Sequence, residues 1–93
     1  MKIVIAGGAG FVGRNLIRIM KEDGFKSEDI TVLDSNMENL KFLEKSGVKL
    51  VSADLSQKGE WEDELVETEY LINLTAQISS PEYVRSCLLL HFL

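Results

Sequence analysis

Four glycines fall within seven residues near the start of the chain, in the stretch GGAGFVG (residues 7–13). Glycine loses more conformational freedom on folding than any other residue, so it is unfavourable inside regular structure. This density therefore predicts a loop in which the backbone turns sharply or another group comes very close. The run KIVIA (residues 2–6) before the loop is short, apolar and rich in β-branched residues, which is typical of a buried strand.

The pattern changes to a helical period after the glycines. Val12, Leu16, Ile19 and Met20 recur at intervals that place them on one face of a helix, and Gly24 is expected to end it. A strand before the glycines and an amphipathic helix after them are the context that gives G-x-G-x-x-G and G-x-x-G-x-x-G meaning. In that context, both spacings predict a dinucleotide-binding loop, and the alternative is a glycine-rich turn without a ligand.

The rest of the chain repeats the alternation of strand and helix. We expect three more apolar strands, at residues 30–33, 48–51 and 70–74. The helices between them are expected after Asn36, which is a favourable cap, and at residues 60–67, where Trp61 and Leu65 share one face.

The C-terminal part of the chain is less clear. Ser80 and Pro81 are a favourable helix start, whereas residues 84–93 form an atypical apolar tail whose structure the pattern leaves open.

Strands without alternating polarity are buried on both faces, which predicts a parallel sheet with helices on both sides. Right-handed crossovers then give an α/β fold, half of a Rossmann-type doubly wound parallel sheet with about four strands. The chain length suits one domain over residues 1–93. Unless the tail covers it, strand 70–74 would be an exposed edge, through which we expect a homodimer or aggregation.

The expected ligand contacts follow from the loop chemistry. Gly7 allows a sharp turn, Gly10 lets the backbone approach a pyrophosphate, and Gly13 lets the helix pack on the strand. Asp34 ends the second strand, where a carboxylate can accept hydrogen bonds from the adenosine ribose, although a purely local turn or cap role is the alternative. Asp34 favours NAD over NADP because it would repel a 2′-phosphate, whereas the basic Arg14 could meet one.

The segments GGAGFVG, LDS, ADL and LINLTAQIS together resemble the N-terminal part of the extended short-chain dehydrogenase/reductase family, over about residues 2–83. Its NAD-dependent sugar-nucleotide epimerases and dehydratases are the most similar members. The resemblance implies that the glycine loop, with Phe11 and Val12 at the helix start, binds the pyrophosphate. It also implies that Asp54 and Leu55 flank the adenine. Residues implied to line the cofactor after the fourth strand are Leu74, Thr75 and Ala76. Capping of the next short helix is the alternative role for Asp54.

The family's proton-transferring pair, Tyr-x-x-x-Lys, is absent from the 93 residues. The position four beyond Tyr70 is Leu74, and the position four beyond Tyr83 is Cys87. We therefore expect no catalytic residue here, and a chain that binds cofactor without turning over a nucleotide sugar. Three interpretations remain open: a truncated N-terminal half of an enzyme, a non-catalytic dinucleotide-binding or regulatory module, and an inert truncated product.

Composition bounds the partners. A net charge of −5 argues against broad binding to nucleic acid or to an anionic membrane surface. The single cysteine, Cys87, permits no disulfide within the chain and fits a reducing cytoplasm. No apolar run is long enough to span a membrane, and the acidic run at residues 60–69 is expected to be a solvated face, not a metal site.

Overall fold

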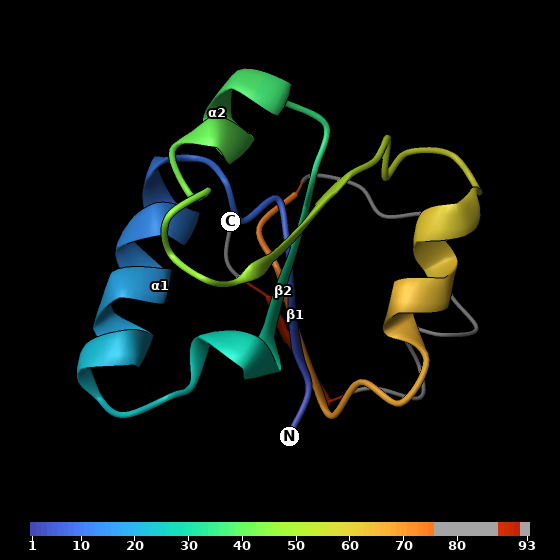
Figure 1. Cartoon of the computed structure of the whole chain (residues 1–93). Helices are drawn as coiled ribbons and strands as arrows, with labels where there is room; N and C mark the ends of the chain where they lie inside the picture. The colour runs from blue at the N-terminus through green and yellow to red at the C-terminus, as the bar shows by residue number, and fades with distance from the viewer. Residues whose placement is uncertain (76–87, 92–93) are drawn as a thin grey trace.

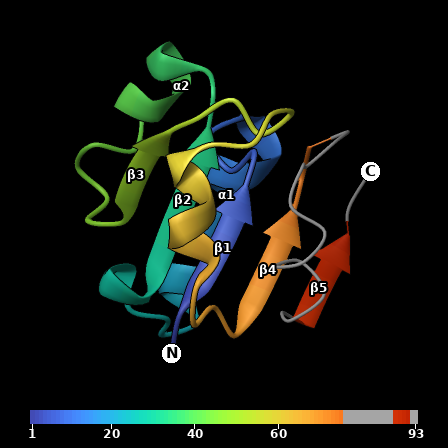
Figure 2. The same ribbon diagram turned by 90° about the vertical axis from the view of Figure 1, so that its right-hand side faces the viewer.

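The computed structural model describes residues 1–75 and 88–91 of the chain. Within them lies one five-stranded parallel sheet, with the strand order β3-β2-β1-β4-β5. The strands are β1 (Ile3–Ala6), β2 (Ile30–Asp34), β3 (Lys49–Ser52), β4 (Tyr70–Asn73) and β5 (Leu88–His91). Figure 2 shows them with their carboxyl ends at the same edge of the sheet. The predicted α/β, doubly wound parallel sheet is confirmed.

Helices cover both faces of this sheet (Figure 1). On one side lie α1 (Phe11–Glu22) and α2 (Met37–Lys41), and on the other lies the 3-10 helix η2 (Glu60–Leu65), drawn in gold. A further 3-10 turn, η1 (Ser27–Asp29), leads into β2. The acidic helix expected at residues 60–67 is thus present, but it is shorter and more tightly wound than predicted.

The core has two parts because β1 is buried on both faces. Ile3 and Ile5 belong to the cluster beneath α1 and α2, whereas Val4 and Ala6 belong to the cluster beneath η2. Trp61 and Leu65 of η2 are buried in the second cluster, as the four-residue spacing predicts. These two clusters fix the sheet between its helices and present its carboxyl edge as a rigid platform.

The helix ends follow the sequence signals. Gly24 has a φ of +99°, and the N–H groups of Gly24 and Phe25 donate to the carbonyl groups of Lys21 and Met20 at the end of α1. This pair of bonds is the Schellman pattern that favours glycine. Asn36 caps α2, since its Oδ1 accepts from the Asn39 N–H at 3.0 Å. Both predicted boundary residues are confirmed.

The predicted inner face of α1 is wrong in part. Val12 and Ile19 are 62% and 49% exposed, whereas Gly13, Ile17 and Met20 are buried. The apolar residues of the helix form a broad arc with Val12 and Ile19 at one margin, so the spacing alone does not show which part of the arc faces the sheet. Contact between Gly13 and the glycine loop selects it.

The fourth strand is not an exposed edge, because the stated exception applies and part of the tail covers it. β5 pairs with β4 in parallel, with Tyr70 opposite Leu88 and Asn73 opposite His91. β4 is therefore an interior strand between β1 and β5, and part of the atypical tail is a strand. The helix start expected at Ser80 and Pro81 lies outside the described residues.

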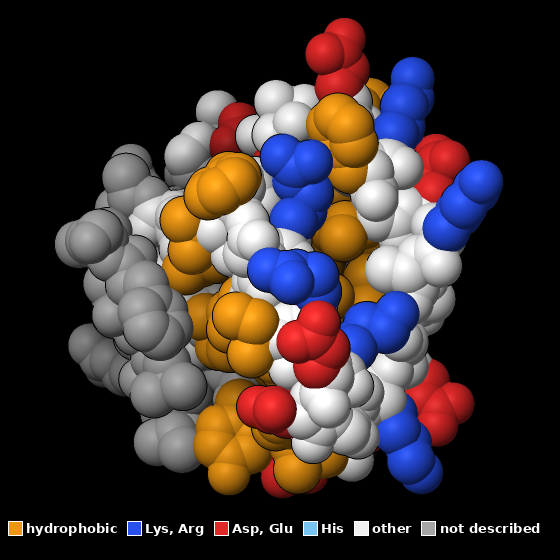
Figure 3. Space-filling view, turned by 90° about the vertical axis from the view of Figure 1, so that its left-hand side faces the viewer, with side chains coloured by type: hydrophobic (Ala, Val, Ile, Leu, Met, Phe, Trp, Pro, Cys, Tyr) orange, Lys and Arg blue, Asp and Glu red, His pale blue; other side chains and the backbone are white. Residues whose placement is uncertain are grey.

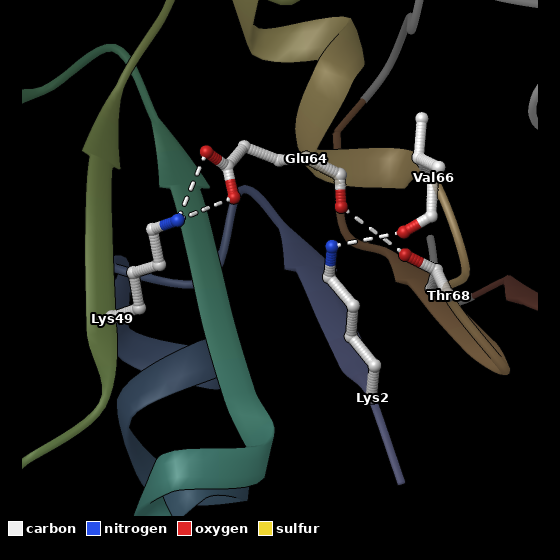
Figure 4. Close-up of polar contacts among 5 residues, drawn as sticks. All are labelled: Lys2, Lys49, Glu64, Val66 and Thr68. Carbon is white, nitrogen blue, oxygen red and sulfur yellow. Dashed lines mark hydrogen bonds and ion pairs between the residues drawn. The ribbon is translucent and has the colours of Figure 1, made fainter.

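Polar contacts fasten η2 and the turn after it to the sheet (Figure 4). Lys49 on β3 pairs with Glu64 at 2.8 Å, and Lys2 Nζ donates to the Val66 carbonyl at 3.0 Å. The second bond supports a turn in which Glu67 adopts a φ of +63°, which is uncommon outside glycine. An exposed ion pair contributes roughly 0–1 kcal/mol, so η2 is held mainly by its buried apolar face.

Candidate functional site

The glycine loop joins the carboxyl end of β1 to the start of α1. Gly7 has a φ of +75°, and a Cβ there would lie 2.8 Å from the Thr75 side chain. A Cβ on Gly8 would lie 2.7 Å from Ile5. A Cβ on Gly13 would lie 2.5 Å from the Gly8 Cα and closer still to its carbonyl group. These three glycines are therefore required by the fold of the loop itself.

Gly10 differs from the other three glycines of the loop. Its φ is −75°, which every residue adopts, and within residues 1–75 and 88–91 no atom beyond its chain neighbours lies within 4 Å of the place where a Cβ would be. Neither the backbone angle nor the packing of these residues explains a glycine at this position. What the residue provides is an open approach to the backbone at the start of α1.

The N-terminus of α1 has no cap from a side chain and no acidic residue in its first turn. The first helical hydrogen bond runs from the Arg14 N–H to the Gly10 carbonyl, at 2.9 Å. By helix geometry, the N–H groups of the preceding residues have no partner within the helix. Phe11 and Val12, at 76% and 62% exposure, stand at this end. The arrangement can hold an anion between backbone donors and the positive end of the helix dipole.

Asp34 lies at the end of β2, next to the loop. Its Oδ2 accepts from the Ala9 N–H at 3.0 Å, and its Oδ1 accepts from the Asn36 N–H at 2.9 Å. Each carboxylate oxygen has two lone pairs, so each can still accept one further hydrogen bond. A ligand with two adjacent hydroxyl groups could therefore donate one hydrogen bond to each oxygen.

Several predicted residues meet in one cavity of about 150 Å³ at the carboxyl edge of the sheet. The predicted residues that line it come from β1, β2, β3 and β4 or the segments just after them: Gly7, Asp34, Asp54, Leu55 and Thr75. Ser35 and Ser56 complete the lining. In α/β folds, ligands bind at the carboxyl edge of the parallel sheet, at the point where the strand order reverses on either side of β1.

Asp54 closes a turn after β3. Its Oδ1 accepts from the Ser56 hydroxyl at 2.6 Å and from the Ser56 N–H at 3.0 Å. These bonds hold the pKa of the Asp54 carboxyl below its ordinary value, the hydroxyl having the larger effect. Asp54 does not cap η2, which begins at Glu60. Leu55 beside it is 6% exposed and packs into the core beneath η2 while lining the cavity.

The segment after β4 supplies the opposite side of the cavity. The Leu74 N–H donates to the Ala6 carbonyl at 2.8 Å, so Leu74 continues the line of β4 past the loop. The N–H and hydroxyl of Thr75 donate to Asn73 Oδ1 at 2.9 and 2.6 Å. Leu74 packs against the core and Thr75 against Gly7. Ala76, the last of the predicted residues, lies outside the described residues.

Arg14 is held beside the loop. Its guanidinium carbon lies 4.4 Å from the centre of the Phe42 ring, and its Nε lies 3.4 Å from the Gly10 carbonyl oxygen. Figure 3 shows Lys and Arg side chains gathered on the side of the molecule where α1 lies. Arg14 thus adds positive charge close to the start of α1.

Sequence reasoning missed the role of Ala9, whose N–H links the loop to Asp34. It also missed Ser35 and Ser56 as cavity residues. Ser56 carries a signal that could have been used, since an aspartate followed two residues later by serine is a common hydrogen-bonded turn. The Ala9 contact carries none, because it joins two residues 25 positions apart.

A larger cavity of about 330 Å³ lies away from this edge. It is lined almost wholly by apolar side chains: Met1, Ile3, Leu16, Met20, Phe25, Tyr70 and Ile72. It offers no cluster of donors for a phosphate, so the smaller and more polar cavity is the better candidate for a nucleotide. None of the helices in the described ranges is both long and apolar enough to cross a bilayer.

Solved structures with the same fold are enzymes of greater length. An NADPH-dependent quinone oxidoreductase from Escherichia coli matches with a TM-score of 0.66 and 21% identity, over 76% of this chain and 26% of that one. A dTDP-glucose 4,6-dehydratase from Bacillus anthracis, solved with NAD, matches with a TM-score of 0.60 and 24% identity, over 83% and 27%. A serine dehydrogenase from Escherichia coli matches with a TM-score of 0.61 and 16% identity, over 77% and 36%.

The chain thus spans between about a quarter and a third of the length of these structures. At such identities the matches show a shared fold. A match of a different kind shows the family. The model of the NAD-dependent epimerase/dehydratase family covers residues 3–86, from the start of β1 to a point beyond β4. The chain belongs to the NAD-dependent epimerase/dehydratase family.

Proposed function

We propose that this chain is the dinucleotide-binding part of an NAD-dependent epimerase or dehydratase that acts on a nucleotide sugar. The observation that carries the proposal is the open backbone at Gly10, which no contact within the described part of the chain explains. It stands at the uncapped start of α1, beside a cavity lined by five of the residues expected to touch the cofactor.

The pyrophosphate would lie over the start of α1. The N–H groups of the first turn would donate to its oxygens, and the absent Cβ of Gly10 would let it approach the backbone. Phe11 and Val12 would contribute their N–H groups, and Gly13 would keep the helix close to the loop. The positive charge of Arg14 supports an anion at this place.

The adenosine half would extend toward β2 and β3. The free lone pairs of the Asp34 carboxylate would accept from the two ribose hydroxyls. Asp54 and Leu55 would flank the adenine, with Leu55 as an apolar surface. Leu74, Thr75 and Ala76 would line the cofactor on the β4 side.

NAD fits this site better than NADP. A 2′-phosphate would replace a hydroxyl donor with negative charge next to the Asp34 carboxylate, whose two oxygens already point at the loop and at Asn36. Arg14 is the nearby cation that could offset such a charge, but it is stacked on Phe42 and directed at the Gly10 carbonyl. The balance supports NAD.

When bound, NAD supplies a hydride acceptor that oxidises a sugar carbon for a short time. The 93 residues contain no Tyr-x-x-x-Lys pair to move the accompanying proton. We therefore expect this chain alone to bind the cofactor and to position it without turnover. Its single cysteine supports a reducing compartment such as the cytoplasm.

The proposal is tested by titrating the purified chain with NADH and following the nicotinamide fluorescence. We expect saturable binding, abolished by Gly10→Val because the side chain would occupy the approach to the phosphates. Gly59→Val is the control, since Gly59 also precedes a helical segment and has extended backbone, but lies outside the cavity. A Cβ at Gly59 would lie 3.3 Å from the Trp61 ring, so this variant also shows how a tight contact outside the site affects binding. Circular dichroism verifies that both variants fold. Absence of saturable binding at millimolar NADH would contradict the proposal and favour an inert product.

A further inference from the structure

Asp34 makes two hydrogen bonds that are unrelated to any ligand. One of its oxygens accepts from the Ala9 N–H, in the middle of the glycine loop, and the other accepts from the Asn36 N–H, at the start of α2. Ala9 is completely buried, so its N–H has no access to water as an alternative partner. A buried N–H without an acceptor is costly, which makes this contact a strong local restraint.

The loop is fastened by the chain at three places. Its first part is held by the Gly7 N–H, which donates to the Leu33 carbonyl at 2.7 Å, and its last part by the close contact between Gly13 and Gly8. The Asp34 carboxylate holds the residue between Gly8 and Gly10. Without it, the backbone that presents the open face at Gly10 has no side-chain support from β2.

We infer that Asp34 is a positioning residue for the pyrophosphate loop, in addition to any contact it makes with a ribose. The inference rests on the proposed function, because it assigns a role within the same site. It separates two roles of one carboxylate: recognition of hydroxyl groups, which needs its outward lone pairs, and fixation of the loop, which needs its bond to Ala9.

The two roles have opposite consequences for a ligand that has phosphates and no ribose. If Asp34 only recognised hydroxyls, its removal would delete a negative charge near an anion, and pyrophosphate would bind equally or more tightly. If Asp34 fixes the loop, its removal releases the backbone donors, and pyrophosphate binds more weakly. The sign of the change therefore distinguishes the roles.

Asp34→Ala and Asp34→Asn form a matched pair for this test. Both remove the charge, but only the amide oxygen of asparagine can still accept from the Ala9 N–H. Calorimetric titration with inorganic pyrophosphate should show binding weakened about fivefold to tenfold in Asp34→Ala, the effect of losing one hydrogen bond, and partly recovered in Asp34→Asn. Unchanged or tighter binding by Asp34→Ala, or no recovery in Asp34→Asn, would overturn the inference.

A second measurement needs no ligand, so it separates this inference from the proposed function. In the unliganded wild type, we expect an NMR coupling across the hydrogen bond between the Ala9 nitrogen and the Asp34 carboxylate carbon. Amide exchange over residues 8–13 should be about tenfold faster in Asp34→Ala than in Asp34→Asn. No coupling and equal exchange would refute the loop contact. These NMR effects without binding of NADH by the wild type would contradict only the proposed function.

Discussion

Alanine at Gly13 should strongly destabilise the fold, whereas alanine at Gly10 should leave its stability nearly unchanged. At Gly13 the new Cβ would lie 2.5 Å from the Gly8 Cα, where ordinary contact begins near 3.4 Å. The loop and α1 would have to separate by at least about 0.9 Å, because the Gly8 carbonyl group is closer still. The obstructing atoms are backbone, so no side chain can rotate away.

The magnitude follows from overpacking. A forced backbone shift of this kind costs about 3 kcal/mol, a large part of the roughly 5–14 kcal/mol that stabilises a domain of this size. The melting temperature should fall by about 12–24 °C, at about 4–8 °C per kcal/mol. Gly10→Ala has no obstructing atom and an ordinary φ, so the free energy of unfolding should change by less than about 0.5 kcal/mol.

Urea denaturation provides the assay, with fluorescence of Trp61 as the probe. Trp61 is the only tryptophan, is 5% exposed and packs on the face of the sheet opposite α1, so it reports on global unfolding. Equal midpoints for Gly13→Ala and Gly10→Ala would refute the assignment of Gly13 to packing and Gly10 to the ligand. A full loss of stability in Gly10→Ala would do the same.

Two other substitutions test the surroundings of the site. Ser56→Ala should raise the pKa of Asp54 toward its ordinary value of 3.8, because the hydroxyl is the main cause of the lowering. The lowered pKa means that the folded state favours ionised Asp54. The ionised carboxylate therefore contributes to stability above pH 3.8, and this contribution is lost as the pH falls through the lowered pKa of the folded state. A carbon-13 NMR titration in which Ser56→Ala leaves the pKa of Asp54 unchanged would contradict the prediction. Arg14→Lys should lose about 0.5–1 kcal/mol of stacking on Phe42 yet keep the positive charge beside Gly10. NADH binding should therefore weaken much less in Arg14→Lys than in Arg14→Ala. Equal weakening in the two variants would argue against a role for the charge.

The strands and the helix ends could be predicted because their signals are local. A short β-branched run before glycines indicates a buried strand without reference to the rest of the chain. Asn36 and Gly24 likewise act on backbone groups within a few residues. It could also be predicted that Gly7, Asp34 and Asp54 meet at one cavity, because parallel strands bring their carboxyl ends to one edge of the sheet. The family model matches residues 3–86, which include these strands, the glycine loop and both aspartates.

Other features depended on contacts between distant parts of the chain. The apolar run in the tail fits a strand or a helix equally well, and only its pairing with β4 makes residues 88–91 a strand. The part of the broad apolar arc of α1 that faces the sheet could not be selected from the spacing alone. In both cases the local pattern permits two structures, and the free energy of packing chooses between them.

The amino-acid sequence by itself determined the order of the first four strands and the helices between them, the place of the glycine loop and the acidic residue that ends β2. These depend on backbone propensity and on short-range hydrogen bonds. Only the tertiary structure decided what Asp34 holds and how much space surrounds each glycine. Within the described residues a Cβ at Gly10 meets no atom whereas one at Gly13 meets Gly8, and Asp34 reaches Ala9 across 25 positions because β1 and β2 lie side by side in the sheet.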